Sequence, residues 1–371
     1  MNAYLSKKMN YLSFLAILGV VLCHAYNWQD RFLMADTALA EGLKPGPMLQ
    51  LCISNALIRF AVPLFFAFSG YKFFMNFTFS WKGYLKKLGK RVRTLLVPFL
   101  IWTVLAGAFL FAVYKIAGLE RYGIVEEKVG NLLNYGPAAW LFDSPAFQLW
   151  YMTDLFKLVI ISPVIYFLVK KCKIVPVIVF GILWLMNMPF MINMDGMLFF
   201  TLGAYLAVHQ IPLAGKEEPE KSGADWERYR RNTIAVVVLW IGGCLVYTFI
   251  SAAMGEAVFA FYVLTALFKL NVLTGIVSVW RLYDLKAEAW QEKPWLKSAV
   301  ASTVFIYVAH EPVQHLLMDV LLEKMHFPGA HTLIYFGLAF CVICVDILVA
   351  ALLRKACPQV YGILVGGRSG L

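Results

Sequence analysis

Residues 11–27 read YLSFLAILGVVLCHAYN, an apolar run without Lys, Arg, Asp or Glu that carries a histidine, His24, near its end. A helix of about 20 such residues spans a bilayer. A histidine inside one is costly to keep in lipid, so its default interpretation is functional. The alternative is a structural histidine bonded to a neighbouring carbonyl. The rest of the chain decides between the two.

The composition excludes a soluble class. The 371 residues are 61% hydrophobic and 15% charged, with a mean hydropathy of +0.70. Soluble domains are nearer half apolar and a quarter charged. We therefore expect an all-α polytopic bundle of about ten transmembrane spans, as one domain over residues 1–371 with a cytoplasmic linker at 210–231. The expected spans are 9–27, 49–75, 94–117, 147–169, 174–190, 196–209, 232–253, 258–280, 298–321 and 332–353.

Lysine and arginine predict the orientation of these spans. Connections on one side, beginning with residues 1–8, hold 23 basic residues, and those on the other side hold five. Cytoplasmic connections carry the excess of basic residues. Both termini are therefore predicted to be cytoplasmic, with His24 near the outer end of its span. The same excess accounts for the net charge of +11, so no nucleic-acid partner is expected.

Two predicted spans contain ionisable residues. Arg59 lies well inside 49–75 and must pair, snorkel or line water. We interpret it as an anion or oxyanion contact, with a structural pair to an acid such as Asp154 as the alternative. His310 and Glu311 lie mid-span directly before Pro312, which indicates a protein-lined or watery cavity. We interpret both as acyl or oxyanion contacts, with a bonded core histidine as the alternative for His310.

Other candidate residues lie at the predicted span ends. Gln148, Trp150 and Tyr151 form either an aromatic belt or a platform for a sugar acceptor. Asp154 and the lysine three residues later have the spacing of a structural ion pair. Residues 81–93 read WKGYLKKLGKRVR and either anchor the chain to anionic lipid or bind phosphate. The candidate phosphate ligands are Lys86, Lys87, Lys90, Arg91 and Arg93.

Several segments together resemble one known family. They are LAILGVVLCH ending at His24, RFAVPLFFAFSGY (59–71), KRVRTLLVPFLIW (90–102), QLWYMTDLFKLVIISPVI (148–165), FFTLGAYLA (199–207) and FIYVAHEP (305–312). In this order and spacing they resemble the acyltransferase 3 family of bacterial integral membrane proteins, over about residues 9–354.

The resemblance implies an activity and a catalytic residue. Such proteins transfer acyl groups, most often acetyl from acetyl-CoA, to hydroxyls of carbohydrate or other acceptors at the cell envelope. His24 occupies the place of the family's proposed catalytic histidine. The family commonly has an arginine eleven residues earlier, where this chain has Ser13. The resemblance also implies the bacterial cytoplasmic (inner) membrane, acyl-CoA as co-substrate, a glycan or glycolipid acceptor, no permanently bound cofactor and no metal. A homo-oligomer stays open.

The expected mechanism starts from a topological problem, because acyl-CoA is cytoplasmic and His24 is predicted near the outer face. We expect a water-lined passage, with the nucleotide of CoA on the basic segment 82–93. His24 would act as general base or carry the acyl group, and Arg59 or His310 would stabilise the oxyanion. Two alternatives remain: a transporter of a small solute or proton-coupled substrate, and an acyltransferase-like protein with altered catalysis, which Ser13 motivates.

Overall fold

The computed structural model describes residues 3–28, 44–116, 122–136, 138–213, 223–254, 258–287 and 293–367. Within these ranges every regular element is a helix and there is no strand, which confirms the all-α prediction. The chain forms two compact units, and each is built from two separate stretches. The first comprises Met1–Phe79 and Ile161–Lys297, and the second comprises Ser80–Ile160 and Ser298–Leu371. The predicted linker 210–231 belongs to the first unit, with 214–222 outside the described residues.

In the described part of the chain, six helical segments are long and apolar enough to cross a membrane. They are Ala3–His24, Pro45–Phe74, Trp81–Lys115, Gly223–Ala253, Phe261–Leu285 and Ala330–Ala356. A seventh is counted if the helices on either side of Ile161 form one span. The predicted count of ten is therefore not confirmed. The fifth and sixth predicted spans are short helices of 11 and 15 residues, and the ninth is divided into three short helices.

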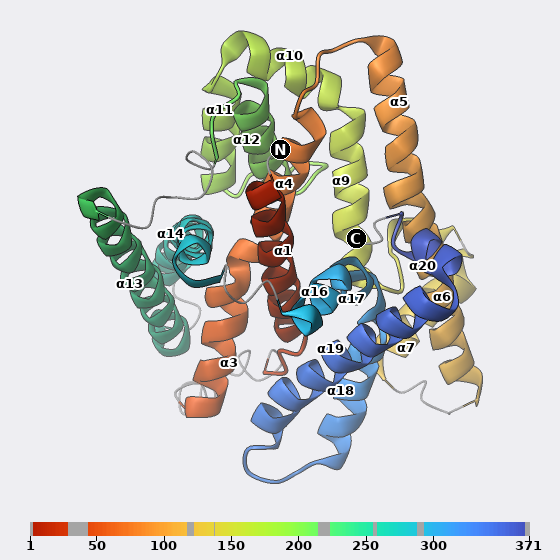
Figure 1. The fold of residues 1–371 in the computed structure, drawn as a ribbon. Helices are drawn as coiled ribbons and strands as arrows, with labels where there is room; N and C mark the ends of the chain where they lie inside the picture. Colours follow the sequence, from red (N-terminus) through yellow and green to blue (C-terminus); the bar gives the residue numbers. More distant parts are fainter. Residues whose placement is uncertain are drawn as a thin grey trace. The chain divides into compact units, whose positions relative to one another are not determined.

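Among the described residues, ten helical elements belong wholly to the first unit, and the α-helices among them are labelled in Figure 1. They are α1 (Ala3–His24), α3 (Pro45–Asn55), η2 (Leu57–Phe60), α4 (Ala61–Phe74), α10 (Ser162–Cys172), α11 (Val175–Leu185), α12 (Met194–Val208), α13 (Gly223–Met254), α14 (Val258–Leu282) and η5 (Tyr283–Ala287). Long α13 and α14 pack side by side, as do α4 and α12.

The α4–α12 crossing depends on two glycines. A Cβ on Gly70 of α4 would collide with the backbone carbonyl of Phe200, and one on Gly203 of α12 would collide with the carbonyl of Ala67 and come within 2.6 Å of Tyr71 N. Small residues let membrane helices approach this closely because no side chain separates their backbones. The two glycines therefore set the spacing of the helix pair.

Replacing Gly203 by alanine is expected to destabilise the protein by about 2 kcal/mol, since the collision is with backbone that must shift. Thermal unfolding in detergent measures the change. Gly181→Ala is the matched control, because a Cβ there meets only Leu198 Cδ1 at 3.9 Å. Equal stability of the two variants would contradict the close backbone contact.

A buried ionic network anchors the start of α1 in the first unit. Lys8 Nζ lies 2.6 Å and 2.8 Å from the two carboxylate oxygens of Asp284, and the Lys8 side chain is 1% exposed. The Tyr4 hydroxyl also donates to Asp284, and the Tyr229 hydroxyl donates at 2.7 Å. The ring of Trp280 lies 4.0 Å from the ammonium group. The network links α1, α13, α14 and η5, the element that contains Asp284.

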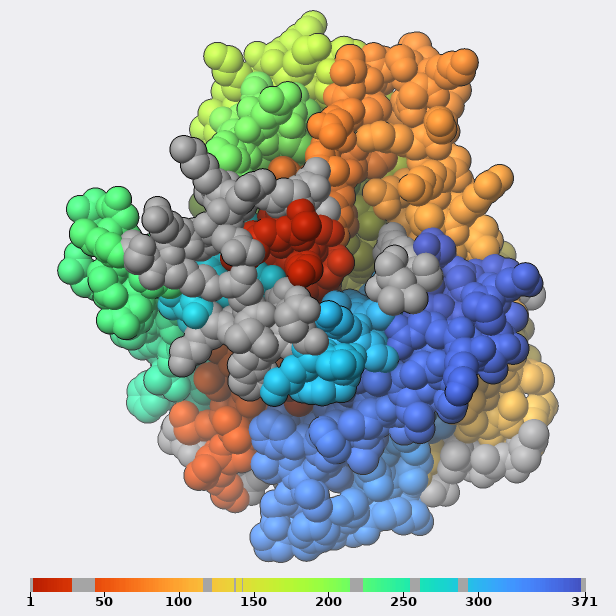
Figure 2. Space-filling model, in the orientation of Figure 1, coloured from red at the N-terminus to blue at the C-terminus, as the bar shows by residue number. Residues whose placement is uncertain are grey.

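Eleven of the described elements belong wholly to the second unit. They are α5 (Trp81–Arg91), η3 (Val92–Leu96), α6 (Val97–Ile116), α7 (Gly123–Tyr135), α8 (Ala139–Phe142), η4 (Phe147–Leu149), α9 (Trp150–Ile160), α17 (Thr303–Ala309), α18 (Val313–Lys324), α19 (Ala330–Ala356) and α20 (Pro358–Leu364). The boundary between units falls within α16 (Pro294–Ala301). Packed α18 and α19 form a continuous blue surface (Figure 2).

Charged groups connect α7 with the turn after α8. Lys128 Nζ lies 2.7 Å from the Asp143 carboxylate and 2.9 Å from Glu127. Burial lowers the pKa of Lys128, but hydrogen bonds and charge interactions with Asp143 and Glu127 outweigh it, so the pKa is raised. This contribution to stability is present below the lysine's ordinary pKa and is lost only as the pH rises through the raised value. It therefore persists at neutral pH.

Candidate active site

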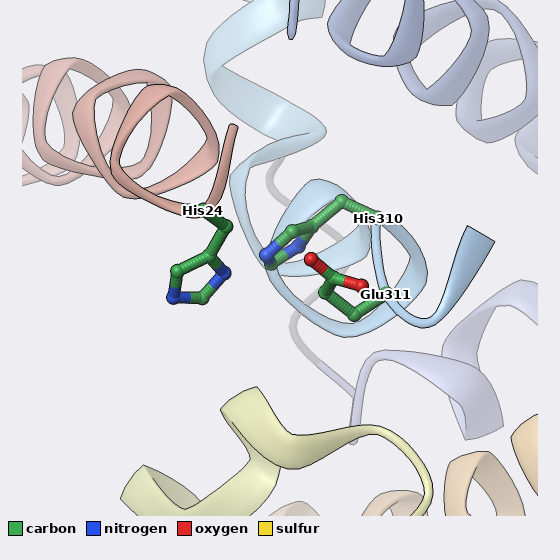
Figure 3. Close-up of side chains that lie close together, drawn as sticks. All are labelled: His24, His310 and Glu311. Atoms are coloured by element: carbon green, nitrogen blue, oxygen red, sulfur yellow. The ribbon is translucent and has the colours of Figure 1, made fainter. Parts of the chain in front are cut away.

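His24 is the last residue of α1 and is half-buried (Figure 3). Beside it, the Cys23 thiol lies 3.4 Å from Ser54 O, which ties this end of α1 to α3. Ser13, eleven residues earlier, donates its hydroxyl to Met9 O at 2.7 Å. The Ser13 hydroxyl is thus hydrogen-bonded within its own helix. It is also uncharged, so it does not replace the positive charge of the arginine that the family commonly has at this position.

Arg59 lies in η2, a short break between α3 and α4. Pro63 explains the break, because proline lacks the N–H that would bond to the carbonyl four residues earlier, that of Arg59. The guanidinium donates to the Asn55 side chain, and its Nε meets no acceptor among the described residues. Its charge acts on Tyr26, two residues after His24. Arg59 is therefore within electrostatic reach of the C-terminal end of α1.

The second unit has a corresponding break at His310, Glu311 and Pro312, between α17 and α18. The missing N–H of Pro312 leaves the carbonyl of Val308 without its helical partner. Gln148 supplies the replacement, since its Nε2 donates to Val308 O at 3.3 Å. The proline and the glutamine, 164 positions apart in the chain, are thus parts of one local structure.

Gln148 is held from two sides. The Tyr307 hydroxyl donates to Gln148 O at 2.9 Å, and the ring of Tyr151 packs edge-on to Tyr307 at 5.9 Å. The Gln148 side chain is buried, and its Oε1 accepts no hydrogen bond from the described residues. Trp150 is 37% exposed. Of the three predicted acceptor contacts, Gln148 and Tyr151 join the helix break and Trp150 faces outward.

The local bonds of His310 define its ring chemistry. Its Nδ1 lies 2.8 Å from Ile306 O, and a carbonyl only accepts, so Nδ1 carries the proton. In the neutral ring Nε2 then holds the lone pair. His310 in this tautomer accepts a proton or hydrogen bond, and it donates to an oxyanion from Nε2 only as imidazolium.

Glu311 is buried beside it. One carboxylate oxygen accepts from the backbone N–H of His315 at 3.2 Å, which satisfies an otherwise unbonded group in the first turn of α18. The other, Oε1, accepts no hydrogen bond from the described part of the chain. Together with Gln148 Oε1, the break presents acceptor oxygens, which suit the hydroxyl groups of an alcohol.

For the acyl transfer that the family resemblance implies, replacing Gln148 by leucine is expected to lower the rate about tenfold, because it removes the donor to Val308 O and the buried acceptor oxygen. The acyl content of the acceptor at matched protein levels measures the effect. Thr153→Ala in the helix that follows, α9, which removes only a bond to Trp150 O, is expected to leave transfer unchanged. A Gln148→Leu protein as active as the control would exclude the glutamine from the site.

The predicted phosphate ligands extend along α5 into η3. Ser80 caps α5 by accepting from Gly83 N at 3.1 Å. Lys86, Lys90 and Arg93 are exposed, and Lys87 and Arg91 are half-buried. The buried ring of Tyr84 fixes the opposite face, since its hydroxyl donates to Ile160 O at 2.9 Å. The helix is strongly amphipathic, with its basic groups available to phosphate or lipid.

A family model described as an acyltransferase domain matches residues 7–350. The chain belongs to this acyltransferase family, the acyltransferase 3 family. It is also 26% identical, over 386 residues, to the succinoglycan biosynthesis protein ExoH of Rhizobium meliloti (strain 1021). That alignment covers 100% of this chain and 94% of the relative. No solved structure matches the chain.

Within each unit the structure groups part of the predicted set. The first unit places Arg59 within electrostatic reach of the end of α1, and the second places Gln148 and Tyr151 against the break at His310. The expected ion pair of Asp154 and Lys157 is confirmed at 2.8 Å. Sequence reasoning missed Tyr307, whose hydroxyl donates to Gln148 O, because its partner lies 159 positions away and no local pattern marks the contact.

Proposed function

We propose that the protein is a membrane O-acyltransferase of the bacterial inner membrane. It moves an acetyl or other short acyl group from cytoplasmic acyl-CoA to a hydroxyl of an envelope polysaccharide or glycolipid. The observation that carries the proposal is the family match over 7–350. The name of the relative, a succinoglycan biosynthesis protein, supports a polysaccharide acceptor.

In the proposed reaction His24 accepts the proton of the acceptor hydroxyl as its oxygen adds to the thioester carbonyl. Arg59 or protonated His310 stabilises the tetrahedral oxyanion. The intermediate then expels the CoA thiolate, which takes the proton back from His24. Glu311, Gln148 and Tyr151 orient the acceptor, and Trp150 contacts its outer part.

We propose further that the nucleotide phosphates of CoA bind the basic residues of α5 and η3, Lys86, Lys87, Lys90, Arg91 and Arg93. A cluster of basic groups attracts phosphate by charge, and three of these five, Lys86, Lys90 and Arg93, are exposed, so donor binding should weaken as ionic strength rises.

The test compares envelope glycans of cells with and without the gene by mass spectrometry. Loss of one acyl mass from a glycan in the deletion strain, restored by the wild-type gene, is expected. Membranes supplied with labelled acetyl-CoA should transfer label and release free CoA thiol. Unchanged glycans, together with solute uptake that needs no CoA, would overturn the proposal in favour of a transporter. Acyl-CoA binding without transfer would indicate altered catalysis.

A further inference from the structure

Lys269 of α14 is a buried lysine that the proposed chemistry does not use. It lies inside the candidate membrane span Phe261–Leu285 and is 8% exposed. Its ammonium group forms no hydrogen bond or ion pair with any described residue. It faces the ring of Trp184 on α11, whose centroid lies 4.3 Å away. A cation–π contact offsets only part of the cost of burying an unpaired charge, so Lys269 needs a further partner.

The ammonium group of Lys269 reaches an accessible space. In the described part of the chain, the unpartnered polar atoms that are fully enclosed include Arg59 Nε and Trp240 Nε1, and Lys269 Nζ is not among them. The stem of the side chain is therefore covered while its charged end is not fully covered. Ionisable residues inside membrane spans face a bundle interior or a water-filled cavity, and they mark substrate pathways. Lys269 thus lines a space that water or a ligand can enter.

The charges around this space do not balance. Asp195, in the first turn of α12, interacts by charge with both Lys269 and Arg59. Trp184 Nε1 donates to Asp195 Oδ1 at 2.6 Å, which holds the carboxylate beside the ring that Lys269 faces. The other described carboxylates of the first unit lie in η5 and near the start of α13: Asp284, Asp225 and Glu227. Two cations thus share one described carboxylate, which leaves one positive charge in excess.

The excess charge selects the class of ligand. A carboxylate carries one negative charge and balances the site, whereas a phosphate monoester carries about −1.5 to −2 at neutral pH and would overcompensate. A carboxylate oxygen also accepts a short, charge-assisted hydrogen bond from an ammonium group. A neutral ligand would leave the buried charge uncompensated. The ligand that fits is therefore an organic carboxylate.

We propose that Lys269 binds a carboxylate group of a substrate, in a site whose net charge Asp195 sets. Lys269, Asp195 and Trp184 form this Lys269 site, and all three belong to the first unit. The site stands on these residues, whereas the source of the carboxylate rests on the proposed function. That function offers two sources, an acidic sugar of the glycan acceptor or an acyl group that ends in a second carboxyl. Both present the same chemistry to Lys269.

The test measures ligand binding to the purified full-length protein in detergent, with probes that differ in charge. Glucuronate is compared with glucuronamide for the sugar source. The N-acetylcysteamine monothioester of succinic acid is compared with its methyl ester for the acyl source. Neither thioester carries the nucleotide of CoA, so the basic residues of α5 do not contribute. The wild-type protein should bind at least one carboxylate about tenfold more tightly than its neutral analogue.

Lys269→Met is expected to abolish that preference, with a loss of about tenfold for the carboxylate and the neutral analogue within about twofold. Asp195→Asn should act in the opposite direction and tighten the carboxylate about threefold, because it removes the competing negative charge. The amide oxygen still accepts from Trp184 Nε1. Lys171→Met, which removes an exposed lysine of the same unit, is the matched control and should change neither ligand.

The inference is overturned if the wild-type protein prefers no carboxylate, or if the preference survives in Lys269→Met. That variant replaces an unpaired buried charge by an apolar side chain of similar length, so its thermal midpoint should equal or exceed that of the wild type. Should it fail to fold, Asp195→Asn decides alone, since a carboxylate bound no more tightly overturns the site. The preferred probe identifies the source. Carboxylate binding by a protein that transfers no acyl group would overturn the proposed function and leave the site in place.

Discussion

A His24→Ala protein is expected to lose acyl transfer by a factor of about 10² to 10⁴, the usual contribution of a general base. His24 ends α1 in the first unit. The positive charge of Arg59 acts on Tyr26, two residues after His24. Without the imidazole the acceptor hydroxyl must add while still protonated, so its nucleophilicity falls. Transfer of label from acetyl-CoA in membranes with matched protein amounts measures the loss.

His209→Ala is the control for this experiment. His209 is also a half-buried histidine at the C-terminal end of a helix, and one ring nitrogen lies 3.1 Å from Val169 O. Its loss should leave transfer within about twofold, since the replaced bond contributes on the order of 1 kcal/mol to folding. Transfer by His24→Ala at the control's rate would remove His24 from the mechanism. A loss in both variants would indicate a general effect on the fold.

Replacing Asp284 by asparagine is expected to cost about 3–5 kcal/mol of stability, because it leaves the buried charge of Lys8 without its counterion. The amide keeps the shape and one acceptor oxygen, so one of the two tyrosine hydroxyls, Tyr4 or Tyr229, still donates to it, and the other must turn to accept from the amide nitrogen. The largest part of the cost is therefore the unpaired ammonium group. Equilibrium or thermal unfolding in detergent measures it, as a fall in the free energy of unfolding or in the midpoint temperature.

Two further variants isolate the charge as the cause. Adding Lys8→Met to the Asp284→Asn protein should recover most of the loss, because no buried charge then remains unpaired. Glu227→Gln breaks a pair with Arg230 in the same unit that is 3.1 Å long, with both side chains more than half exposed. It should cost less than about 0.5 kcal/mol, as exposed pairs do. A double variant no more stable than Asp284→Asn would contradict this account.

Local patterns in the sequence predicted several parts of the site. The apolar run ending at His24, the mid-span Arg59 and the group before Pro312 each stand out, because a polar residue or proline in an apolar helix is costly. The two prolines also account for the observed breaks, since each removes a bond to the carbonyl four residues earlier. What satisfies that carbonyl, Gln148 in the case of Val308, depends on a residue 160 positions away.

Other parts were not predictable in this way. Lys8 looked like one more basic residue of the cytoplasmic side, yet it is buried against Asp284, 276 positions later. Asn271 lies in an ordinary apolar stretch, and its side chain packs against α13 only because Gly243 of that helix has no side chain. The sequence predicts one continuous span over 298–321. In the structure three short helices form instead, separated at Ser302 and at His310–Pro312.

The amino-acid sequence was sufficient to predict the helical class, the apolar segments and His24 as the candidate catalytic residue. These follow from composition and from residues close together in the chain, whose effects add locally. The partners of the buried polar groups follow from helix packing. Each unit is assembled from two distant stretches of chain, so the Lys8–Asp284 network exists only once those stretches have packed together.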